Sequence, residues 1–303
     1  MPDELLTHPA RREPARPPKV IHFELTWQQA AGAAACLAIT TAALRAARKP
    51  RLTSVSVLTR ETALVVGLFA LWQYAGSFAL MGPDGALGRA QWIWHVERVL
   101  KMPSETAIQR FFLPHPLLVQ FFNLYYDVLH FPVLIACLIW LFAWHRRSYG
   151  RWRTTLVVFT GLSLLVQFIP VAPPRMLPGT RMVDTGVVYH QSVYSNATGF
   201  NADQLSAMPS VHVGWAILVA IAIIATARSR WRWLAVLYPV MTTLAVVVTA
   251  NHFWLDGVAA VIILAIALAA QILVRRLLTA RTAAAGPTSP DQTGEAAMAG
   301  RQQ

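Results

Sequence analysis

Three short polar clusters stand at the ends of long apolar runs in this 303-residue chain: APPR at 172–175, PSVH at 209–212 and HFWLD at 252–256. Arginine stays protonated and binds phosphate oxygens through two parallel N–H groups, so Arg175 offers a fixed anion-binding charge. The alternative for Arg175 is an interfacial arginine that meets lipid headgroups. The first cluster alone does not decide between these roles.

The third cluster contains a histidine and an aspartate four residues apart, His252 and Asp256. On a helix, this spacing places both side chains on one face. A carboxylate that accepts a hydrogen bond from one imidazole nitrogen fixes the tautomer and leaves the other nitrogen as a nucleophile. The alternative is a polar pair at a helix end without a catalytic role.

The second cluster has the composition of a helix start. Pro209 suits the first turn, where its missing N–H costs nothing, and Ser210 adds a hydroxyl beside free backbone N–H groups that can bind an anion. His212, one turn inside, is placed to reach a leaving oxygen. The alternative is ordinary capping, with His212 as a buried, hydrogen-bonded histidine. Taken together, the three clusters predict a phosphate site with a nucleophile and a proton donor.

The elements that must position these clusters are membrane helices. Hydrophobic residues make up 55% of the chain and charged residues only 13%, where a soluble domain has about 25%. A bilayer core needs about 20 mainly apolar residues in a helix. We expect an all-α, polytopic membrane helix bundle with six core transmembrane helices. The apolar segments are 61–82, 122–143, 154–171, 210–227, 233–250 and 254–274.

The remaining segments frame this core. An alanine-rich run at 28–46 either spans the membrane or lies in its interface, and loop 83–116 has the helical spacing of interfacial amphipathic helices. We divide the chain into a disordered tail, an uncertain N-terminal helix with a basic linker, a catalytic membrane domain and a second disordered tail. Their ranges are 1–27, 28–59, 60–276 and 277–303.

The net charge of +12 has a topological explanation, because the cations gather in alternate loops between apolar runs. We therefore do not expect nucleic acid as a partner. Cation-rich loops face the cytoplasm, which places all three polar clusters on the extracytoplasmic side. The Arg- and Ala-rich composition indicates a bacterial plasma-membrane protein. The cation-rich loops contain Arg45, Arg48, Lys49, Arg51, Arg60, Arg146, Arg147, Arg151, Arg153, Arg228, Arg230, Arg232, Arg275, Arg276 and Arg281.

The three clusters also resemble, in order, spacing and helix placement, the signature motifs of the type 2 phosphatidic acid phosphatase superfamily. The surrounding sequence resembles its inositol phosphorylceramide synthase-like branch, including WIWHVERVLKMPSETAIQRFF and NLYYDVLHFPV. The resemblance covers about residues 60–275. It implies a six-helix membrane core and a phosphohistidine intermediate.

By motif position, the resemblance assigns the nucleophile to His252, with Asp256 as its partner. It assigns protonation of the leaving group to His212, and binding of the phosphate oxygens to Arg175 and Ser210. The implied substrate is a phospholipid or lipid phosphate. The acceptor is water or an alcohol such as inositol or a lipid alcohol, so hydrolase and transferase both stay open.

The sequence departs from the superfamily pattern at three positions. Phe168 replaces a lysine, Met176 replaces a proline, and Val246 replaces an arginine. Two phosphate-binding cations are therefore missing, although the synthase-like branch often lacks them. Arg181 or His190, in the same outer loop, could substitute, and an ordinary loop role is the alternative for each.

Two further polar residues, Asp127 and His130, lie three apart within an apolar segment. Charged groups within spans are costly and tend to be functional, so this pair either supports the site or meets water near the boundary. We expect no metal or other cofactor, on the argument that the carboxylates do not cluster. Two other functions stay open: a transporter or channel, and a catalytically inactive membrane scaffold.

Overall fold

The structure, a computed structural model, describes residues 26–76, 85–191 and 204–284. Within these ranges every regular element is a helix, apart from one isolated bridge between Val171 and Ser206. The predicted all-α fold is therefore confirmed. Most of each predicted tail, 1–25 and 285–303, lies outside the described residues.

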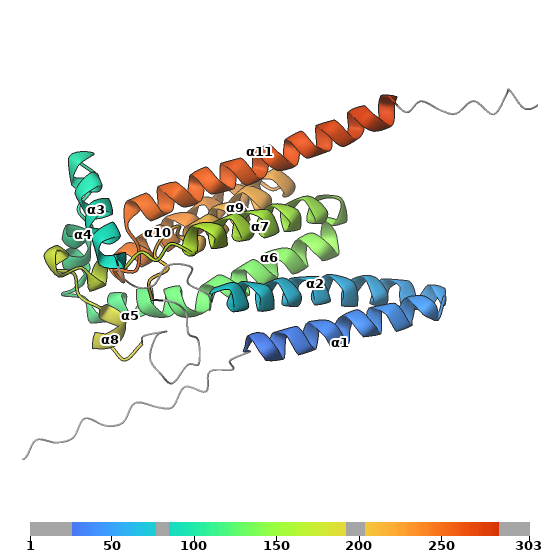
Figure 1. The fold of residues 1–303 in the computed structure, drawn as a ribbon, viewed down its shortest axis with the longest axis horizontal. Helices are drawn as coiled ribbons and strands as arrows, with labels where there is room; N and C mark the ends of the chain where they lie inside the picture. Colours follow the sequence, from blue (N-terminus) through green and yellow to red (C-terminus); the bar gives the residue numbers. More distant parts are fainter. Residues whose placement is uncertain (1–25, 77–84, 192–203, 285–303) are drawn as a thin grey trace, which may run out of the picture.

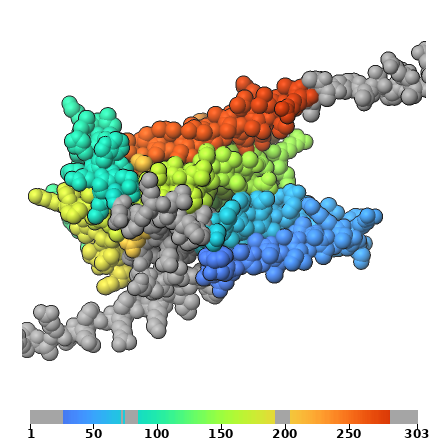
Figure 2. Space-filling view, in the orientation of Figure 1, coloured from blue at the N-terminus to red at the C-terminus, as the bar shows by residue number. Residues whose placement is uncertain are grey.

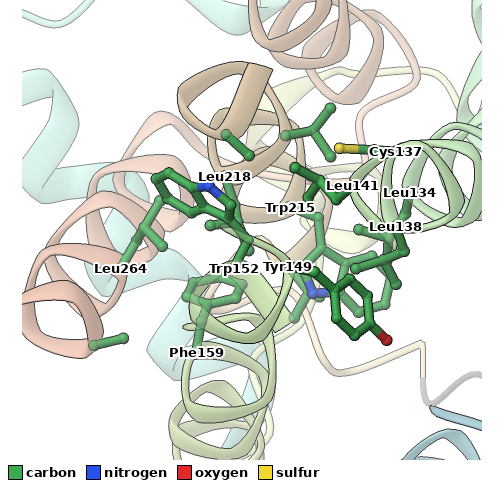
Figure 3. Close-up of a cluster of buried hydrophobic side chains, with 14 of the residues drawn as sticks. Leu134, Cys137, Leu138, Leu141, Tyr149, Trp152, Phe159, Trp215, Leu218 and Leu264 are labelled. Atoms are coloured by element: carbon green, nitrogen blue, oxygen red, sulfur yellow. The ribbon is translucent and has the colours of Figure 1, made fainter. Parts of the chain in front are cut away.

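Five helices form the centre of the bundle and run along its long axis (Figure 1). Their apolar side chains meet in one buried cluster that includes Leu141 from α6, Trp152 from α7, Trp215 from α9 and Leu264 from α11 (Figure 3). The central helices are α6 (His130–Trp144), α7 (Arg146–Gln167), α9 (Val211–Thr226), α10 (Leu237–Val248) and α11 (Trp254–Ala284).

Close packing between α7 and α9 depends on a glycine. A Cβ atom on Gly214 would lie 2.0 Å from Cζ of Phe159, whose ring is fully buried. Only a residue without a side chain fits there, two positions after His212. The contact holds the first turn of α9 at a fixed distance from α7.

Among the described residues, four helices are long and apolar enough to cross a membrane, and the chain is an integral membrane protein. Helix α9 is apolar but shorter, and α7 is not among the four. All six predicted segments contain helix, while the count of six spans stays a prediction. The four are Pro50–Leu71, Pro116–Trp144, Arg230–Val248 and Trp254–Arg281.

The alanine-rich run forms helix α1 (Trp27–Ala46), which pairs with α2 (Thr53–Gly76) as an antiparallel hairpin (Figures 1 and 2). The two helices stay in contact along the hairpin: Thr41 donates a hydrogen bond to Thr59, and the rings of Trp27 and Tyr74 are in contact. Helix α1 thus follows the direction of the bundle helices. The hairpin is fastened to α7 by an ion pair between Glu61 and Arg153.

The predicted domain boundaries fall inside helices. Position 60 lies within α2, and position 276 lies within α11, which continues to Ala284. The short helix η1 (Pro50–Leu52) leads directly into α2, so the basic linker is only a few residues long. The residues 77–82 at the end of the first predicted span lie outside the described residues.

One end of the bundle is covered by short helices (Figure 1). Loop 83–116 contains two of them, which confirms that this loop is helical, and Gln109 ties the cover to the bundle by donating to the carbonyls of Val183 and Val248. Several apolar side chains here are exposed, among them Trp92 and Phe111. The elements are α3 (Ala86–Val99), α4 (Glu105–Phe112), α5 (Pro116–Leu124), η2 (Tyr125–Leu129), η3 (Pro174–Met176), η4 (Pro178–Thr180) and α8 (Thr185–Val188).

Candidate functional site

The three polar clusters meet beneath this cover. His252 lies between α10 and α11, Ser210 precedes α9, and Arg175 lies in η3 after α7. Backbone hydrogen bonds join the segments: the N–H of Ser210 donates to the carbonyl of Asp256, and the N–H of Arg175 donates to that of Ala250. Segments far apart in sequence are thus held together at one end of the bundle.

His252 is held in one tautomer by a backbone carbonyl. Its Nδ1 lies 2.6 Å from the carbonyl oxygen of Ala207, which can only accept a hydrogen bond, so Nδ1 carries the proton. Nε2 therefore has a free lone pair, and it is buried without a hydrogen-bond partner. Ala207 is held in turn by its own N–H, which donates to the carbonyl of Val171 beside the bridge between Val171 and Ser206. One imidazole nitrogen is thus anchored by the backbone and the other is unsatisfied.

The carboxylate of Asp256 contributes differently from the sequence prediction. His252 precedes α11 by two residues, so the pair does not share a helical face. Oδ2 of Asp256 lies 3.4 Å from Nδ1 of His252 and accepts the N–H of Phe253 at 2.8 Å. The carboxylate thus closes the helix start, as in half of a capping box, and adds negative charge beside the imidazole.

The PSVH cluster caps α9. The oxygen of Ser210 accepts the N–H of Val213, which satisfies one free donor of the first turn, and the hydroxyl keeps its own proton to donate. The prediction that Pro209 occupies the first turn is wrong, because the helix begins at Val211. Pro209 precedes the capping residue.

His212 lies in a row of rings. Its ring centroid is 5.7 Å from that of His252 and 4.4 Å from that of His130, and Tyr126 stacks on it at 4.5 Å. Nδ1 of His212 and Nε2 of His130 are buried without hydrogen-bond partners. Nδ1 of His130 is 3.2 Å from the hydroxyl of Tyr238. His130, His212 and His252 therefore lie side by side, and each has one buried ring nitrogen without a hydrogen-bond partner.

The guanidinium of Arg175 is buried and oriented by two side chains. It donates to Oδ1 of Asn251, the residue before the candidate nucleophile, and its Nε lies 3.2 Å from Oδ2 of Asp184. Asp184 itself caps α8 by accepting the N–H of Val187. The sequence predicted Arg175 but gave no reason to select its partners Asn251 and Asp184.

The remaining predicted residues are placed unequally. Arg181 and His190 are exposed, both with left-handed backbone conformations, and no contact joins them to the histidines. Asp127 is half-buried in η2 and, in the described part of the chain, has no hydrogen bond or ion pair. Val246, where the superfamily pattern has an arginine, is buried in an apolar cluster with Tyr126.

Two buried glutamates behind Asp256 were missed. Glu97 accepts the N–H of Leu255, and burial together with Glu105 raises the pKa of Glu97 to about 9. The argument that the carboxylates do not cluster is therefore wrong, although no group in the described ranges could hold a metal ion. A signal was present: Ala90, Ile93 and Glu97 follow helical spacing, which puts Glu97 on the buried stripe of α3.

A family model described as the PAP2 superfamily matches residues 91–270, more than half of the chain and all of the site residues from Glu97 to Asp256. No curated protein and no solved structure matches the chain.

Proposed function

The chain belongs to the PAP2 superfamily, whose members are generally phosphatases, and we propose that it transfers the phosphoryl group of a lipid phosphate or phospholipid through a phosphohistidine at His252. The observation that carries this proposal is the free, buried Nε2 of His252, held by the hydrogen bond between Nδ1 and the Ala207 carbonyl. A neutral imidazole with that tautomer is a nucleophile without further activation.

The first step is an in-line displacement. The lone pair of His252 Nε2 attacks phosphorus and the bond from phosphorus to the leaving oxygen breaks. His212, held in its protonated form by the negative charge of the bound phosphate, donates its proton to that oxygen. Arg175 and the hydroxyl of Ser210 stabilise the charge on the remaining phosphate oxygens. Positioning and charge stabilisation of this kind account for most of the catalysis in phosphoryl transfer.

The second step regenerates the enzyme. Water, or the hydroxyl of an alcohol such as inositol or a lipid alcohol, attacks the phosphohistidine while neutral His212 accepts its proton. The bond from phosphorus to Nε2 breaks. With a lipid phosphate as substrate, water releases inorganic phosphate and an alcohol leaves as its phosphate monoester. With a phosphodiester lipid, whose second substituent stays on phosphorus, attack by an alcohol gives a new phosphodiester. These outcomes share every residue of the site.

A lipid substrate is supported by where the site lies. The histidines are at one end of a membrane bundle, beneath short helices that expose apolar side chains such as Trp92, Phe111 and Leu117. Such helices favour the membrane interface, where the phosphate of a lipid is found. We place this end on the extracytoplasmic side, because the opposite loops contain the arginine clusters.

The test is a panel of lipid phosphates and phosphodiester lipids offered to the purified protein in detergent micelles, with and without inositol, scoring free phosphate, inositol phosphate and new phosphodiester lipid. We expect the unmodified protein to turn over at least one substrate and His252→Ala to lose turnover while keeping its melting temperature. His95→Asn is the matched control, because His95 is an exposed histidine on α3 at the same end. Equal phosphate release by the unmodified protein and His252→Ala would refute the proposal.

A further inference from the structure

Glu97 is fully buried on α3, yet its carboxyl group points at the helix that begins beside His252. Its Oε1 accepts the N–H of Leu255 at 2.8 Å, one of the first-turn donors of α11 that has no partner within the helix. Leu255 directly precedes Asp256. Glu97 therefore fixes the turn that places the Asp256 carboxylate against the imidazole.

The second oxygen of Glu97 faces another carboxyl group. Oε2 of Glu97 and Oε1 of Glu105 are both buried without a conventional hydrogen-bond partner, and the two side chains interact with each other. Two carboxyl oxygens make a hydrogen bond only when one of them is protonated. Glu105 has the closer cation, since its Oε2 lies 2.9 Å from Nη2 of Arg98, whereas Oε2 of Glu97 lies 4.0 Å from the same atom. The proton therefore belongs to Glu97.

The charges around Glu97 agree with this assignment. From α4 it faces Glu105, from α11 it faces Asp256, and the only cation that contacts it in the described residues is Arg98, 4.0 Å away on its own helix. Three ionised carboxylates beside one guanidinium would be costly in a buried space. If Glu97 is neutral, the positive charge of Arg98 offsets the negative charge of Glu105. The negative charge of Asp256 then lies beside the imidazole of His252.

We propose that Glu97 is a positioning residue of the reaction: as a neutral acid hydrogen-bonded to Glu105, it holds the first turn of α11 and thereby sets the geometry of His252 and Asp256. This inference rests on the proposed function. Loss of the proton would break the hydrogen bond to Glu105, set the charge of Glu97 against those of Glu105 and Asp256, and place a further negative charge near the incoming phosphate.

The proposal predicts a specific effect of alkaline pH, because burial and Glu105 raise the pKa of Glu97 to about 9. Glutamine keeps an oxygen that can accept from Leu255 and an N–H group that can donate to Glu105, and it cannot ionise. Glu97→Gln should therefore preserve the neutral arrangement at every pH. Glu97→Ala removes both bonds, and displacement of catalytic groups by about 1 Å costs on the order of 100-fold in rate.

The first experiment compares kcat/KM of the unmodified protein and of Glu97→Gln from pH 7 to 10, using the most active lipid phosphate of the panel. Taking the ratio of the two cancels the titration of His212 and of the substrate. We expect kcat/KM of the unmodified protein, divided by that of Glu97→Gln, to be near one at pH 7 and to fall about tenfold or more towards pH 10. Glu61, a buried glutamate of the distant α1–α2 hairpin, provides the control. The same ratio taken with Glu61→Gln should not change from pH 7 to 10.

The second experiment does not depend on activity. Infrared difference spectra between pH 7 and 10 should show loss of the carbonyl stretch of a protonated carboxylic acid, and this signal should be absent from Glu97→Gln. An unchanged signal in Glu97→Gln, or a flat activity ratio in an active enzyme, overturns the inference. Equal phosphate release by the unmodified protein and His252→Ala instead refutes the proposed function itself.

Discussion

Replacing Gly214 with alanine should destabilise the protein although alanine is the better helix former. Alanine gains about 1 kcal/mol of helix propensity over glycine. Its Cβ, however, would lie 2.0 Å from Cζ and 2.7 Å from both Cε atoms of Phe159, a ring that is fully buried and cannot turn away into solvent. Overpacking of this kind costs about 1–3 kcal/mol, or more for so close an approach. We expect a net loss of about 1–2 kcal/mol.

The assay is thermal unfolding in detergent micelles, with Gly161→Ala as the matched control. Gly161 lies on α7, and a Cβ there would meet nothing within 4 Å, so its replacement should raise the melting temperature. Gly214→Ala should lower it and, because His212 is two residues away, should also lower the rate of phosphate release. Equal or greater stability of Gly214→Ala would refute the packing argument.

Three further predictions concern charge and proton transfer. Burial and Glu105 raise the pKa of Glu97 to about 9, so the folded protein retains a proton that an unfolded glutamate releases near 4.5. The free energy of unfolding should therefore fall as pH rises across that range, and Glu97→Gln should flatten this slope in melting curves. His212→Asn should slow release of an alcohol by about 100-fold or more and of a nitrophenolate, which leaves unprotonated, far less; equal losses would contradict its role as acid. Arg153→Gln should weaken attachment of the α1–α2 hairpin by about 1 kcal/mol, because Arg60 still pairs with Glu61; this should be seen as faster proteolysis between α1 and α2, with unchanged turnover per folded molecule.

The helices and the three clusters were predictable because both rest on local pattern. Apolar runs of about 20 residues identify membrane helices, and Ser210, His252 and Asp256 are recognisable from spacing alone. The clusters meet because each stands at the same end of a span. That conclusion required only the alternation of cation-rich and cation-poor loops.

Partners from distant segments were not predictable. The sequence selected Asp256 as the group that fixes the His252 tautomer, whereas the shorter contact is the Ala207 carbonyl, 45 residues away. The same holds for Glu97 and Leu255, which are 158 residues apart. Backbone carbonyls and long-range pairings leave no mark in residue spacing.

Local geometry bears on two placements that the sequence left open. Residues 125–129 form a π-helical turn, which shifts the register of the following residues and brings His130 against His212. Alanine content left open whether residues 28–46 span or lie flat, and the even contacts of α1 along α2 give it the direction of a bundle helix. Pairing with a neighbouring helix decides this orientation, and hydropathy alone does not.

The most direct test of the central claim is to trap the covalent intermediate. An active lipid phosphate labelled in its phosphoryl group is mixed with the enzyme, quenched in base, and the labelled peptide is sequenced by mass spectrometry. The account predicts a base-stable, acid-labile label on His252 that appears before product is released and is absent from His252→Ala. A label on a serine or aspartate, or turnover by an enzyme that never becomes labelled, would contradict it.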